Sequence, residues 1–111
     1  MDFKQNPLSQ SISDLHAQGL VLAKARHAFL LKDAEKGHWD ARMINASPGK
    51  SYAEKSNNAK ASEEWLSFHK ELAKLESLFE FEKLKFSIME RDWQSQYLAM
   101  KLDESIIRKQ E

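Results

Sequence analysis

The spacing of apolar residues is helical along almost the whole chain. From Ile12 onwards they recur three or four positions apart, which places them on one face of an amphipathic helix. Ser11 and Asp14 resemble a capping box, in which side chains satisfy the backbone amides that a helix end leaves free. The pattern predicts one long helix over about residues 11–45, preceded by a flexible arm over residues 1–10.

The helical pattern stops at residues 45–49, Asn-Ala-Ser-Pro-Gly, because proline and glycine interrupt helices. Ser51 and Glu54 then form a second capping box. Its Ser51 hydroxyl accepts from a free amide, and its Glu54 carboxylate reaches back to the Ser51 amide. This box predicts a short helix over about residues 51–60, whose pattern weakens at residues 56–58.

The last part of the chain has the most regular pattern. Ser62 resembles an N-cap, and the two glutamates after it suit the positive end of a helix dipole. They predict a long helix over about residues 63–109. Its apolar residues alternate three and four positions apart, which is the heptad rhythm of a coiled coil. This heptad seam consists of Leu72, Leu75, Phe79, Phe86, Met89, Trp93, Met100 and Ile107.

The heptad seam predicts packing between helices and between chains. A second apolar stripe lies on a neighbouring face and consists of Leu78, Phe81, Leu84 and Ile88. A helix that is apolar on two faces needs two neighbours, so the first helix covers one face and another subunit the other. Small residues such as Gly19 and Gly37 would let a neighbouring helix approach closely. The polar seam positions Glu82, Gln96 and Asp103 either set register and oligomer number or line a polar site in an oligomer.

Composition agrees with an all-α fold. The 111 residues are 41% apolar and 31% charged, with three glycines and two prolines. They suit a single helical domain over residues 11–111, folded as a long helical hairpin with coiled-coil-like packing that forms a homo-oligomer. Cysteine is absent, which excludes disulfides and thiolate metal ligands. No segment resembles a signal peptide or a bilayer-spanning run, so we expect a cytoplasmic protein without a membrane partner.

Charge is balanced overall but divided along the chain. Residues 1–60 contain nine Lys or Arg and six Asp or Glu, whereas residues 61–111 contain eight and eleven, so the two parts carry +3 and −3. This polarity either orients self-association and places a basic end against phosphates, or it is ordinary solvated surface.

Gly49, Lys50 and Ser51 read like the end of a nucleotide-binding P-loop. That motif needs a glycine five residues before the Gly-Lys pair, where this chain has Ile44, and a buried strand leading into it. A helix precedes the turn here, so we exclude a nucleotide site. Lys50 either contacts a phosphate beside the helix N-terminus or belongs to a plain capping turn.

Other catalytic and metal patterns are missing from the sequence. His16, His27 and His38 are each eleven residues apart, roughly 16 Å per step along a helix, which is too far for one ion to bridge. No Ser-His-Asp order, glycine elbow or cysteine nucleophile occurs. We therefore predict a protein that is not an enzyme and has no metal or cofactor.

Aromatic and basic residues around the central turn are the better candidates for a functional surface, because bases stack on aromatic rings beside cations. The candidate nucleic-acid residues are Lys36, Trp39, Arg42, Lys50, Tyr52, Lys55 and Lys60.

The turn resembles a layout found in small helical proteins encoded beside recombination and single-strand-binding genes in bacteriophages. There, a long helix ends in Gly-Lys-Ser/Thr-x-Ala-Glu-Arg/Lys, an Ala-Ser-Glu linker follows, and a tryptophan lies near the end of the last helix. Here residues 49–55 read GKSYAEK, residues 59–64 read AKASEE, and the tryptophan is Trp93. The likeness covers about residues 20–100.

This layout is similar to that of phage recombination mediators of the UvsY type. The resemblance implies a helical oligomer that binds single-stranded DNA and helps a RecA-like recombinase displace the single-strand-binding protein. It also implies that the basic turn meets the DNA backbone, with the five candidate cations on phosphates and Trp39 or Tyr52 stacked on a base.

Two main function classes remain open. The first is a non-catalytic recombination mediator in a bacterial host cell, whose partners are itself, single-stranded DNA, a recombinase or a single-strand-binding protein. The second is a helical module that binds only protein, as an assembly scaffold or a phage inhibitor of a host protein. Zero net charge and the rich apolar seam favour the second class. A purely structural tetramer is a third possibility.

Overall fold

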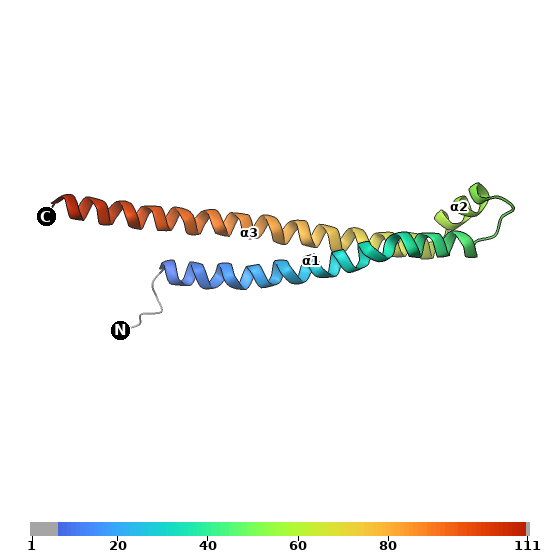
Figure 1. The fold of residues 1–111 in the computed structure, drawn as a ribbon, viewed down its shortest axis with the longest axis horizontal. Coiled ribbons are helices and arrows are strands. Elements are labelled where there is room, and N and C mark those ends of the chain that lie inside the picture. Colours follow the sequence, from blue (N-terminus) through green and yellow to red (C-terminus); the bar gives the residue numbers. More distant parts are fainter. Residues whose placement is uncertain (1–6, 111) are drawn as a thin grey trace. The chain divides into compact units, whose positions relative to one another are not determined.

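A computed structural model describes residues 7–110 of the chain, which form three α-helices. Helix α1 spans Pro7–Ala46, α2 spans Tyr52–Lys60 and α3 spans Glu63–Gln110 (Figure 1). No strand occurs within these residues, so the predicted all-α order of a long, a short and a long helix is confirmed.

Helix α1 begins at Pro7, four residues before the predicted start. Proline is favoured at the first helical position, because it lacks the N–H that a helix start leaves free and its φ angle suits the helix. The capping box predicted at Ser11 and Asp14 is therefore wrong, since both lie inside the helix. The part of the predicted arm before Pro7 lies outside the described residues.

The side chains of that misassigned box make other hydrogen bonds. The Ser11 hydroxyl donates to Gln96 Oε1 on α3 at 2.8 Å, and Asp14 accepts from the Gln10 amide at 2.8 Å within α1. Ser11 thus joins two helices instead of ending one.

The turn before α2 confirms the predicted N-cap. Ser51 has an extended backbone, and its hydroxyl accepts from the Glu54 amide at 3.2 Å. The Glu54 carboxylate, however, accepts from the Lys50 amide at 3.0 Å and not from Ser51 as predicted. The reason is the sharp turn at Gly49, whose φ of 150° brings the backbone against the first turn of α2.

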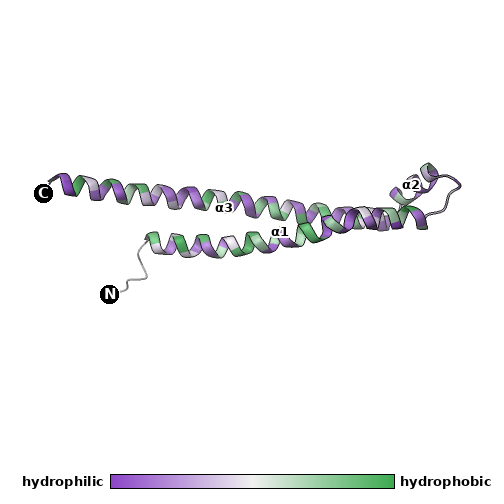
Figure 2. Cartoon of the chain, in the orientation of Figure 1, coloured by the Kyte–Doolittle hydropathy of each residue, from purple (hydrophilic) through white to green (hydrophobic). Residues whose placement is uncertain are grey.

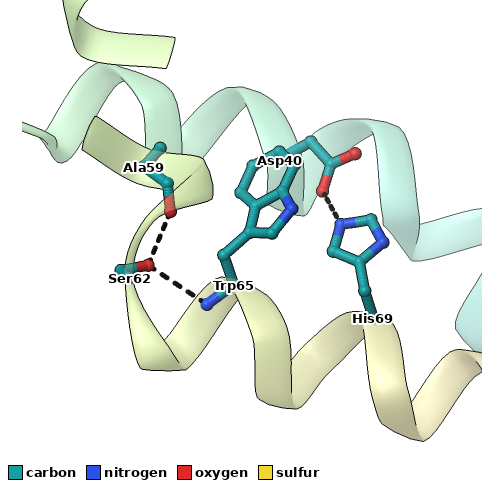
Figure 3. Close-up of polar contacts among 5 residues, drawn as sticks. All are labelled: Asp40, Ala59, Ser62, Trp65 and His69. Carbon is teal, nitrogen blue, oxygen red and sulfur yellow. Dashed lines mark hydrogen bonds and ion pairs between the residues drawn. The ribbon is translucent and has the colours of Figure 1, made fainter. Parts of the chain in front are cut away.

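Helix α2 does not weaken at residues 56–58, which corrects the prediction. Ser56 is buried, and the Asn58 side chain donates to the Pro48 carbonyl at 2.6 Å, which ties the helix to the preceding turn. Ser62 then caps α3 as predicted: its hydroxyl accepts from the Trp65 amide at 3.2 Å and donates to the Ala59 carbonyl at 2.6 Å (Figure 3).

The chain divides into two compact units, each with one segment of α1 and one of α3. Within the described residues, unit 1 consists of residues 7–23 and 81–110, and unit 2 of Lys24–Glu80, which includes α2. The helix segments run antiparallel within each unit, because contacts move backwards along α3 as they move forwards along α1. The predicted hairpin packing is therefore confirmed within each unit.

Unit 1 is held together by close helix packing and a buried polar pair. A Cβ atom added at Gly19 would lie 3.4 Å from the Phe86 ring, so the predicted close approach is confirmed at this glycine. Gln18 and Glu82 are 5% and 9% exposed, and the Gln18 amide donates to the Glu82 carboxylate and, at 3.3 Å, to the Glu82 carbonyl. The pair determines which position of α1 lies opposite which position of α3, so it sets the register between the two helices.

Unit 2 contains most of the buried apolar side chains. Ala25, Ile44, Ala59, Phe68 and Leu72 are buried, and Phe29 stacks on Phe79 with ring centroids 5.9 Å apart. No large side chain of the described part of the chain is fully buried. Apolar and polar residues instead alternate along the surfaces of the long helices (Figure 2).

Candidate functional surfaces

An aromatic cluster lies between α1 and α3 in unit 2. The Trp39 ring stacks on Phe68, with ring centroids 4.1 Å apart and an interplanar angle of 8°. Its centroid lies 5.6 Å from that of the tilted Trp65 ring. Trp65 in turn stacks on His69 at 4.7 Å. Such contacts contribute beyond simple area burial, at roughly 0.5–1.5 kcal/mol per pair.

A polar contact closes the same cluster. His69 Nε2 lies 2.9 Å from an Asp40 carboxylate oxygen, and both side chains are about three-quarters buried (Figure 3). Lys32 places its ammonium group 4.7 Å from the Phe68 ring centroid, a cation–π distance. Sequence reasoning missed both contacts, because the partners lie 29 or more residues apart and no local pattern links them.

The candidate nucleic-acid residues all belong to unit 2, on α1, the turn and α2. Lys36, Arg42, Lys50 and Lys60 are exposed, whereas Lys55 is half-buried. Among the described residues, no carboxylate forms an ion pair with the four exposed cations. Their charges are therefore open to a ligand in solution.

The two aromatic candidates differ in accessibility. Tyr52 is 72% exposed at the first position of α2, so its ring face is open for stacking. Trp39 is half-buried, with its ring already stacked on Phe68. Of the two, Tyr52 is the ring that the fold presents to solvent.

Two residues of the heptad seam contact α1 of the same chain: Phe79 stacks on Phe29, and Phe86 lies beside Gly19. Leu72 is buried, while Ile107 at the far end of the seam is 57% exposed. Of the polar seam positions, Glu82 and Gln96 bond to α1 within unit 1, and Asp103 is exposed. A role of the seam in an oligomer stays a prediction.

The second stripe is exposed on both units. Leu78 is 48% exposed in unit 2, and Phe81, Leu84 and Ile88 are 60%, 61% and 50% exposed in unit 1. With Met89, the last three line a shallow apolar groove. A second apolar groove of unit 1 is lined by both helices and includes Ile12 and Leu20 of α1 and Phe86 of α3.

No histidine, aspartate and glutamate side chains of residues 7–110 gather in threes or more where they could hold a metal ion. Over the same residues, none of the helices combines the length and the apolar character that crossing a bilayer requires. The surfaces that distinguish this chain are therefore the cationic turn of unit 2 and the apolar stripe of unit 1.

Comparison with protein-family models, with curated proteins and with solved structures finds no match to this chain.

Proposed function

We propose that the chain is a non-catalytic accessory of recombination that self-associates and binds single-stranded DNA through the turn region of unit 2. The observation that carries the proposal is the combination of exposed, unpaired cations with an exposed ring. Lys36, Arg42, Lys50 and Lys60 are exposed, and Tyr52 is 72% exposed beside Lys50 in the sequence.

Sequence-independent binding of single-stranded DNA usually combines two kinds of contact. Lysine and arginine neutralise phosphates and release counterions, while a ring supplies a stacking surface that accepts any base. With zero net charge, the chain would bind weakly as a single copy, and several copies on one strand would raise the apparent affinity.

The proposed biological role follows the resemblance to UvsY-type mediators. An oligomer that holds single-stranded DNA would help a recombinase displace a single-strand-binding protein, which requires binding but no chemistry.

Fluorescence anisotropy with a labelled thymidine oligonucleotide tests the binding step. We expect Arg42→Ala with Lys50→Ala to weaken binding at low salt about tenfold or more, and to reduce the salt dependence by about two phosphate contacts. Lys70→Ala with Lys74→Ala is the matched control, because it removes two exposed lysines of the same unit from α3. Equal losses in both pairs, or no binding by the unaltered protein at low salt, would exclude a specific strand-binding turn.

The second candidate function is a helical module that binds only protein. The exposed apolar stripe of α3 favours it, because contiguous exposed apolar surface marks interaction sites. An oligonucleotide that never binds, together with a defined complex between this chain and a host protein, would decide for this alternative.

A further inference from the structure

In unit 1, the second apolar stripe of α3 continues beyond Ile88 towards the end of the helix. The α3 stripe consists of Phe81, Leu84, Ile88, Leu98, Leu102 and Ile106. Each of these side chains is between 46% and 65% exposed, so the rest of residues 7–110 leaves the stripe uncovered.

The α3 stripe faces away from α1. A helix turns by about 100° per residue, so all six side chains fall within an arc of about 100°. Glu82, Phe86 and Gln96 contact α1. Viewed down the helix axis, their mean direction lies roughly 150° from the middle of that arc. The stripe is therefore a separate face, and α1 cannot cover it without giving up its own contacts.

The stripe has an internal symmetry that matches an antiparallel copy of itself. It contains two apolar clusters, one over residues 81–88 and one over residues 98–106, and Arg91 and Ser95 lie between them in the same row. Leu84 with Leu102, Ile88 with Leu98, and Arg91 with Ser95 are three pairs centred on the same position, residue 93. An antiparallel copy in this register would bring each apolar cluster against the other.

We infer that the α3 stripe docks a second copy of this chain in antiparallel orientation, with Leu84 opposite Leu102 and Ile88 opposite Leu98 of the second copy. Arg91 selects this orientation: it meets Ser95 of the second copy, whereas a parallel pair in register would place Arg91 against Arg91 on the apolar seam. Two like charges there repel each other where little water remains. The inference rests on the proposed self-association and names its surface and its geometry.

Single cysteines test the geometry, because the chain has none of its own. Ile88→Cys and Leu98→Cys, which both retain Arg91, are prepared separately, one of them isotopically labelled, then mixed and oxidised, and the masses of the cross-linked dimers are measured. We expect the mixed sample to form predominantly the dimer that contains one copy of each variant, since position 88 lies opposite position 98. A parallel pair would instead cross-link each variant to itself, and that result would overturn the inference.

Light scattering with Leu98→Glu tests the surface independently. Leu98 is 65% exposed, so the substitution is compatible with the fold, which circular dichroism checks. We expect the dissociation constant of self-association to rise by about tenfold or more, because each copy places a charge in the apolar contact. Leu31→Glu is the matched control, a leucine of unit 2 that is 55% exposed and lies outside the stripe.

Oligonucleotide anisotropy on the same samples separates the two proposals. If the unaltered chain is monomeric at every concentration, or if Leu98→Glu self-associates as the unaltered chain does, the stripe inference is wrong, whatever the anisotropy gives. If the cross-link and Leu98→Glu behave as expected but no oligonucleotide binds, the inference holds and strand binding fails.

Discussion

At the scale of single residues, two glycines of this chain have opposite roles. Gly49 adopts a φ of 150°, and a Cβ atom there would lie 2.8 Å from the Lys55 backbone nitrogen, so only glycine fits without strain. Gly37 lies inside α1, and a Cβ atom added there would have no neighbouring atom within 4 Å. The first glycine makes the turn possible, whereas the second only weakens a helix.

These roles predict stability changes of opposite sign. We expect Gly49→Ala to lower the free energy of unfolding by about 1–3 kcal/mol, because it combines backbone strain with a steric clash. Gly37→Ala should raise it by up to about 1 kcal/mol, since alanine is the better helix former. Urea titrations followed by circular dichroism measure both, and a loss at Gly37 would mean that this position needs glycine after all.

At the scale of helices, the register of α1 on α3 in unit 1 depends on Gln18 and Glu82. Their side chains are buried and bonded to each other, so a shift of either helix would leave an amide and a carboxylate without partners. This contact supports the interpretation that Glu82 sets register, here between two helices of one chain, over the interpretation that it lines a polar site.

A double-mutant comparison tests that interpretation. Gln18→Leu alone should lower the free energy of unfolding by about 1–3 kcal/mol, because it leaves a buried carboxylate without its hydrogen-bond partner. Gln18→Leu with Glu82→Leu should recover most of that loss, since it removes both polar groups, and the freed register should appear as broadened amide signals in NMR spectra of unit 1. If the double substitution lowers the free energy of unfolding as much as the single one, the contribution of the pair is not limited to hydrogen-bonding its own buried polar groups.

At the scale of the whole molecule, the two units have different contents. Unit 2 contains the aromatic cluster and the cationic turn, and unit 1 contains the buried polar pair and the exposed α3 stripe. Division into two units, each with its own internal contacts, predicts that damage to one stays local.

Phe86→Glu tests that division. The substitution places a charge against Gly19 and should open unit 1, which hydrogen exchange would report as loss of protection over residues 7–23 and 81–100. Protection around Trp39 and Trp65 in unit 2 should change little. A uniform loss over the whole chain would show that the units fold as one.

Local patterns along the chain were enough to predict the three helices, the N-caps at Ser51 and Ser62 and the apolar rows of α3. These features depend only on residues a few positions apart in the sequence, because helical spacing and capping hydrogen bonds both act over that range. The same patterns misplaced the start of α1, because Ser11 and Asp14 have a capping pattern that Pro7 overrides. Leu98, Leu102 and Ile106 continue the α3 stripe at the same helical spacing, so this part of the stripe is also encoded locally.

The pairing of side chains across the helices emerged only from the packed structure. Asp40 with His69, Gln18 with Glu82 and Ser11 with Gln96 are separated by 29, 64 and 85 residues, and no periodicity encodes such pairings. The same packing stacked the half-buried Trp39 ring on Phe68, while Tyr52 stayed in solvent. Helical spacing tells which face a residue lies on, but a contact depends on how two faces are matched, and the sum of many weak side-chain contacts sets that match.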